Sequence, residues 1–89
     1  MKIVVYGIST CDECMLLKNN LQTMKLPFDF LDADSEKHSQ FLDEKFVDML
    51  PFVIIYDDNS KNIWEKSGKI TLTEIVNEIE RTTRDSRRA

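Results

Sequence analysis

Residues 2–14 read KIVVYGISTCDEC, and this stretch decides which fold we expect. Its first part, residues 2–6 (KIVVY), is a nearly continuous run of apolar and β-branched residues, which is typical of a strand buried on both faces. Cys11 and Cys14 follow at the point where the apolar spacing changes to that of a helix. The stretch therefore predicts a strand-to-helix junction with a Cys-x-x-Cys pair at its turn.

The first helix is expected to begin at the cysteines. Thr10 and Glu13 have the spacing of a capping box, which makes Thr10 the N-cap and Cys11 the first helical residue. The helix is expected to continue to Leu26, because Pro27 cannot extend it. The apolar residues at helical spacing are Cys14, Leu17, Leu21 and Met24.

A second helix is expected after a short strand over residues 28–32. Asp34 or Ser35 provides its N-cap, because both residue types accept hydrogen bonds from free backbone donors. The spacing of its apolar residues predicts one buried face. The residues on that face are Phe41, Leu42, Phe46 and Met49.

The second half of the chain predicts a hairpin and a last helix. Residues 51–56 (PFVIIY) give the strongest strand signal, and the polar turn after them predicts an antiparallel partner over residues 62–66. Thr71 and Glu74 have the spacing of a capping box for a helix over residues 71–81. The apolar stripe of this helix consists of Leu72, Ile75, Val76 and Ile79.

The predicted order of elements is β-α-β-α-β-β-α. Strand–helix–strand units imply parallel pairing, whereas the short turn after residue 56 implies an antiparallel hairpin. We therefore expect an α/β fold with a mixed four-stranded sheet and helices on both of its faces. The domain is expected to span residues 1–81, and residues 82–89 are expected to form a basic, flexible tail.

Composition excludes several classes of protein. The chain has 89 residues, a net charge of −4 and 42% hydrophobic residues, which is typical of one small globular domain. Its longest apolar stretches, residues 3–8 and 51–56, are far shorter than the ~20 residues of a membrane span. All four arginines lie in the last nine residues, so the rest of the chain is strongly acidic and is not expected to bind nucleic acid. We expect a monomer.

The two cysteines carry the chemistry. At a helix start, free backbone donors and the helix dipole stabilise a thiolate at Cys11, whereas Cys14 lies one turn further on the apolar side. This division predicts that Cys11 attacks a substrate disulfide and that Cys14 resolves the mixed disulfide. Such a pair is typical of the cytoplasm, or of the host cytoplasm for a virus-encoded protein. A metal-binding pair and an inert structural pair are the other interpretations.

Together these residues resemble the glutaredoxin family within the thioredoxin fold, including the NrdH-type redoxins. The resemblance covers residues 1–81 and rests on the Cys-x-x-Cys helix start, on Leu50-Pro51 before a strand, and on Gly68 before the last helix. It implies that the Leu50–Pro51 bond is cis and that the backbone of Leu50 pairs with the substrate polypeptide. It further implies a substrate groove formed by Leu50, Pro51, Thr10, Lys18, Gly68 and Lys69.

The resemblance also implies the activity and the partners. The activity is thiol–disulfide exchange that reduces protein disulfides, with ribonucleotide reductase as one recipient. A disulfide reductase or glutathione serves as the reductant, and no metal or organic cofactor is needed. The dipeptide between the cysteines, Asp12-Glu13, departs from the family, whose members commonly have uncharged residues there.

Two alternatives to an enzyme stay open at this stage. A pair of thiolates can hold Cu(I), so a soft-metal carrier is the first. Copper-carrying domains also place Cys-x-x-Cys after a first strand, but their order is β-α-β-β-α-β and they end in a strand, whereas this chain is expected to end in a helix. The second alternative is a non-catalytic interaction module with the thioredoxin fold.

Overall fold

The computed structural model describes the backbone of residues 1–88 and the side chains of residues 1–83, and Ala89 lies outside the described residues. The order of elements in residues 1–88 is β-α-β-α-β-β-α, as the sequence predicts. The elements are β1 (Lys2–Gly7), α1 (Asp12–Thr23), β2 (Asp29–Asp32), α2 (Glu36–Glu44), β3 (Phe52–Tyr56), β4 (Asn62–Ser67) and α3 (Leu72–Arg88).

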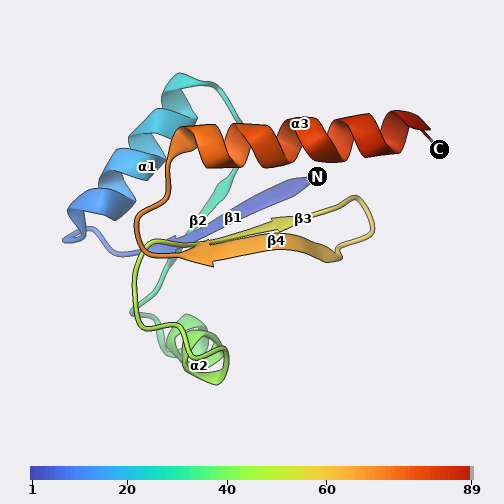
Figure 1. Ribbon diagram of the computed structural model, residues 1–89. Helices are drawn as coiled ribbons and strands as arrows, with labels where there is room; N and C mark the ends of the chain where they lie inside the picture. Colours follow the sequence, from blue (N-terminus) through green and yellow to red (C-terminus); the bar gives the residue numbers. More distant parts are fainter. Residues whose placement is uncertain (89) are drawn as a thin grey trace.

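The strands of this part of the chain form a mixed sheet in the order β2-β1-β3-β4. β1 pairs in parallel with β2 and antiparallel with β3, and β3 pairs antiparallel with β4. Helices α1 and α3 lie over one face of the sheet and α2 lies over the other (Figure 1). The predicted α/β topology with helices on both faces is therefore confirmed.

The uninterrupted apolar character of β1 and β3 follows from this sandwiched position. Alternate residues of a strand point to opposite faces, so a strand covered on both sides must be apolar at every position. In β1, Val5 packs into the core under α1 and α3, and Val4 into the core that α2 covers. In β3, Val53 and Ile54 divide between the same two cores.

The start of α1 differs from the prediction by one residue. Cys11, not Thr10, is the N-cap: its backbone is extended (φ −92°, ψ 110°), and its Sγ accepts a hydrogen bond from the Cys14 N–H at 3.2 Å. The exposed Thr10 lies in the turn before it, where Cys11 N–H donates to Ile8 O at 3.1 Å. The sulfur therefore takes the place that the Thr10 hydroxyl was expected to take.

Helix α1 also ends earlier than predicted. It stops at Thr23, because Lys25 adopts a left-handed conformation (φ 57°). Lys25 N–H then donates to Gln22 O and Leu26 N–H to Leu21 O, which is the hydrogen-bond pattern of a Schellman motif. The chain therefore reverses before Pro27 can act as the stop.

Helix α2 ends in the same way. Because of this ending, two of the four residues that were expected on its buried face are exposed instead. Ser35 caps the helix, as predicted, through a hydrogen bond from His38 N–H to Ser35 Oγ at 3.3 Å. Leu42 is buried, but a left-handed Phe46 (φ 59°) reverses the chain after Glu44. Phe46 and Met49 consequently point outward, with 91% and 57% of their surface exposed.

Helix α3 begins where expected but is longer than predicted. Thr71 N–H donates to Glu74 Oε2 at 2.8 Å and Glu74 N–H to Thr71 Oγ1 at 3.3 Å, which confirms the capping box. The helix continues to Arg88 instead of ending at residue 81, so residues 82–88 extend it. Their flexibility stays a prediction, and the side chains of Arg84, Arg87 and Arg88 lie outside the described part.

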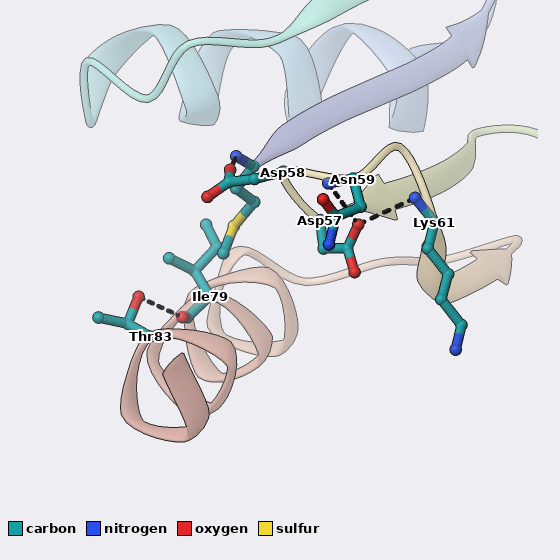
Figure 2. Close-up of polar contacts among 7 residues, drawn as sticks. Asp57, Asp58, Asn59, Lys61, Ile79 and Thr83 are labelled. Atoms are coloured by element: carbon teal, nitrogen blue, oxygen red, sulfur yellow. Dashed lines mark hydrogen bonds and ion pairs between the residues drawn. The ribbon is translucent and has the colours of Figure 1, made fainter. Parts of the chain in front are cut away.

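The hairpin turn and the chain start meet at the end of the sheet opposite α1's first turn. Figure 2 shows the Asp57 carboxylate accepting hydrogen bonds from the backbone N–H groups of Asn59 and Lys61, both at 2.9 Å. The N-terminal ammonium of Met1 pairs with Asp58 beside this turn. No helix in residues 1–88 is long and apolar enough to cross a membrane.

Candidate active site

Three segments meet at the end of the sheet where β1 stops and β3 starts. Tyr6 pairs with Phe52 in the antiparallel register, so Gly7 and Pro51 are the next residues of adjacent strands. The Pro51 carbonyl accepts a hydrogen bond from Gly68 N–H at 3.0 Å, which ties the end of β4 to the same place. The first turn of α1, with the dithiol, lies at this end of the sheet as well (Figure 1).

Cys11 is the accessible thiol of the pair. Its side chain is partly exposed and carries no disulfide. As the N-cap it lies beside backbone N–H groups that have no helical acceptor, and its Sγ already accepts one of them, that of Cys14, at 3.2 Å. The sulfur is therefore accessible at the start of the helix, in the position from which a nucleophile can attack.

Cys14 is in the opposite situation. It is fully buried on the inner side of α1 beside Leu17 and Leu21. Burial, followed by the neighbouring Cys11 side chain, raises the pKa of Cys14 to about 11 from an ordinary value of 9.0. Cys14 is therefore a neutral thiol near pH 7, and the two sulfurs lie in unequal environments.

The Leu50–Pro51 peptide bond is cis, as the resemblance implied. Pro51 is buried, and Leu50 is half-buried against the same core cluster as Ile8 from the loop before the cysteines. The segment before β3 and the segment before α1 therefore pack on the same core cluster.

Comparison with solved structures identifies the fold of this chain. The chain is similar to thioredoxin 1 from Thermosipho africanus, with a TM-score of 0.78 and 24% identity over 98% of this chain and 99% of that one. The chain has the thioredoxin fold. It is also similar to the glutaredoxin-like NrdH-redoxin from Escherichia coli, with a TM-score of 0.66 and 22% identity over 79% of this chain and 86% of that one. No protein-family model and no curated protein matches the sequence.

Within this thioredoxin fold, Gly7 is a residue that the sequence analysis missed. A Cβ at position 7 would lie 2.9 Å from the Sγ of Cys14 and 2.9 Å from the ring of Phe30, which is closer than side chains approach one another. Glycine at the end of β1 therefore lets the buried thiol pack directly against the strand. The signal available in the sequence was one of only two glycines, placed at the end of a buried strand.

The other predicted groove residues divide into two sets. Gly68 lies at the site, with a positive φ of 91° and its N–H on Pro51. Thr10 and Lys69 are exposed in the loops that precede α1 and α3. Lys18, which the resemblance placed in the groove, has its ammonium 5.1 Å from the centre of the Phe30 ring, as a cation–π contact.

The described residues do not add further metal ligands to the two cysteines. No group of three or more cysteine, histidine or carboxylate side chains is placed to hold an ion in that part of the chain. The element order also ends in α3, unlike the β-α-β-β-α-β order of copper-carrying domains. Cu(I) held by the two thiols alone remains a matter for experiment.

The buried thiol predicts a pH dependence of stability. Below pH 9 Cys14 is protonated in both the folded and the unfolded chain, but between pH 9 and 11 only the unfolded chain loses this proton. Folding stability should therefore fall as pH rises through this range, by about 2 kcal/mol from Cys14 alone. Urea unfolding of the reduced protein and of Cys14→Ala at pH 8 and pH 11 measures it, because the variant lacks this contribution. An equal pH dependence in both proteins would contradict the assignment.

Proposed function

We propose that this protein is a glutaredoxin-like thiol–disulfide oxidoreductase that reduces protein disulfides with the Cys11–Cys14 dithiol. The observation that carries the proposal is the inequality of the two sulfurs: one is partly exposed among backbone donors, and the other is buried with a raised pKa. The thioredoxin fold, seen in thioredoxin 1 and in NrdH-redoxin, supports this function.

The proposed reaction proceeds in two exchanges. The Cys11 thiolate attacks one sulfur of the substrate disulfide, which forms a mixed disulfide and releases the other substrate sulfur as a thiolate. Cys14 then gives its proton to the released substrate thiolate and attacks the Cys11 sulfur, which closes the Cys11–Cys14 bond and releases the second substrate sulfur as a thiolate. The protein dithiol loses two electrons, and the substrate disulfide gains them.

The segment before β3 is the proposed docking place for the substrate chain. Among the described residues, neither backbone group of Leu50 pairs with another backbone group, and β3 takes up sheet pairing only from Phe52. An extended peptide can therefore add its own backbone hydrogen bonds at Leu50. Pro51, which is buried and held by Gly68, fixes the position of this segment.

The oxidised protein needs a reductant to act again, and we propose a disulfide reductase or glutathione. One of the similar structures, thioredoxin f2, is described in complex with ferredoxin:thioredoxin reductase, which supports a reductase as partner. Ribonucleotide reductase is the proposed recipient by resemblance to the NrdH-type redoxins. Regeneration with glutathione and glutathione reductase, compared with regeneration by thioredoxin reductase, separates the two reductants.

A single-turnover reaction tests the function without any reductant. The fully reduced protein is mixed with one equivalent of the neutral bis(2-hydroxyethyl) disulfide and quenched with acid. We expect one disulfide consumed per protein, two mercaptoethanol molecules released and a protein lighter by two hydrogens. A protein that keeps both thiols free under these conditions would rule the function out and leave the metal-carrier and interaction-module alternatives.

A further inference from the structure

We propose that this dithiol selects disulfides surrounded by positive charge and discriminates against anionic disulfides, oxidised glutathione among them. The inference rests on the proposed function and names the class of substrate at the same site. It also assigns Asp12 and Glu13 as residues that determine specificity.

Asp12 and Glu13 directly follow the attacking sulfur in the chain. Both occupy the first turn of α1, and both side chains are exposed. None of the ion pairs among the side chains of residues 1–83 involves either carboxylate. Two uncompensated negative charges therefore lie next to the sulfur that a substrate has to approach.

A hollow beside the loop that leads into Cys11 adds to this negative charge. Its volume is about 330 Å³, and the loop before Cys11, from Gly7 to Thr10, forms one wall. Phe30, Asp32 and Asp34 form the remainder. The ammonium of Lys18 lies over Phe30 and offsets one of these charges. The four carboxylates of Asp12, Glu13, Asp32 and Asp34 outnumber the two ammonium groups of the predicted groove, those of Lys18 and Lys69, so the segments around the start of α1 carry an excess of negative charge.

Because of Coulomb interaction, this excess of negative charge should make the protein react faster with cationic than with anionic disulfides. A small disulfide bound for attack brings its own charged ends to within several ångströms of the first turn of α1. At 0.01 M ionic strength the screening length is ~30 Å, so a cationic disulfide is attracted and an anionic one repelled. Two carboxylates at such distances in water should change the ratio of the cationic to the anionic rate by about tenfold.

The test uses three disulfides of the same size class: cystamine, which is cationic, bis(2-hydroxyethyl) disulfide, which is neutral, and 3,3′-dithiodipropionate, which is anionic. Single-turnover rates of the reduced protein are measured with each, and the same rates with dithiothreitol correct for the reactivity of the probes themselves. At 0.01 M salt we expect the corrected rate with cystamine to be about ten times the corrected rate with dithiodipropionate. At 0.5 M salt the ratio should approach one.

The variant Asp12→Asn/Glu13→Gln assigns the effect to the two residues. Its corrected ratio should fall at least about threefold below that of the unmodified protein. A change in the thiolate fraction of Cys11 alters all three rates alike and cancels in the ratio. Asp43→Asn/Glu44→Gln, which removes two charges from α2 on the opposite face of the sheet, is the matched control and should leave the ratio unchanged.

The outcomes separate this inference from the proposed function. If the neutral disulfide is reduced but the corrected ratio stays near one at low salt, the inference is wrong and the function stands. A ratio that Asp12→Asn/Glu13→Gln does not lower would also overturn it. If the neutral disulfide is not reduced at all, the proposed function itself fails.

Discussion

A Cys11→Ser variant is expected to lose disulfide reduction by more than about 10³-fold, because the remaining thiol, that of Cys14, is buried and not exposed to attack a substrate. The Cys14→Ser variant should behave differently. Its Cys11 still attacks, but the mixed disulfide cannot be resolved, so the protein should accumulate as a stable adduct with the substrate half. Mass spectrometry of both variants after reaction with bis(2-hydroxyethyl) disulfide measures the difference.

The two variants control for each other. Each replaces one sulfur by oxygen in the first turn of the same helix, but the serine at position 14 is buried and the serine at position 11 is not, so the folded state of each variant has to be checked separately. Retained activity in Cys11→Ser, or an adduct on that variant and none on Cys14→Ser, would reverse the assigned roles. Near-ultraviolet circular dichroism before the reaction confirms that both variants are folded.

The second large effect is expected at Gly7. In Gly7→Ala the new Cβ would lie 2.9 Å from the Cβ and Sγ of Cys14 and from the Phe30 ring. Because Gly7 belongs to the central strand β1, the strand cannot move away freely, and α1 has to shift instead. We expect a loss of about 1–3 kcal/mol in the free energy of urea unfolding and faster alkylation of Cys14 in the folded protein.

A double-mutant cycle isolates the contact. Cys14→Ala removes the sulfur but keeps the Cβ, so Gly7→Ala should cost measurably less in that background than in the native one. Gly68→Ala is a useful comparison, because its cost comes from the positive φ of 91° and it should leave Cys14 protected. Full stability in Gly7→Ala, with Cys14 still protected from alkylation, would show that the strand and α1 do not pack as described.

Patterns of apolar residues predicted most of the fold. The buried positions of β1 and β3 are apolar on both sides of the sheet because both sheet faces are covered, and this regularity is visible in the sequence. The helix ends were less predictable. Lys25 and Phe46 take left-handed conformations that glycine usually adopts at such ends, so the sequence contains no signal for either reversal.

The site was predictable only where the signal is local. The Cys-x-x-Cys spacing indicated an accessible and a buried thiol, and the structure places Cys11 and Cys14 in those environments. The N-cap was not predictable, because the choice between Thr10 and Cys11 depends on which residue is extended. Gly7 and Lys18 depend on contacts with Phe30, which comes from β2 and is distant in sequence. The cis bond followed from the family resemblance alone.

Peptide mapping of the quenched single-turnover reaction tests the central claim most directly. Samples taken in the first part of the reaction with bis(2-hydroxyethyl) disulfide are digested, and the cysteine that carries the mercaptoethanol group is identified. We predict the group on Cys11 at the earliest times, followed by its disappearance as the Cys11–Cys14 disulfide forms. Early adducts on Cys14, or on both cysteines equally, would contradict an account in which one sulfur attacks from the end of α1 while the other waits, buried and protonated.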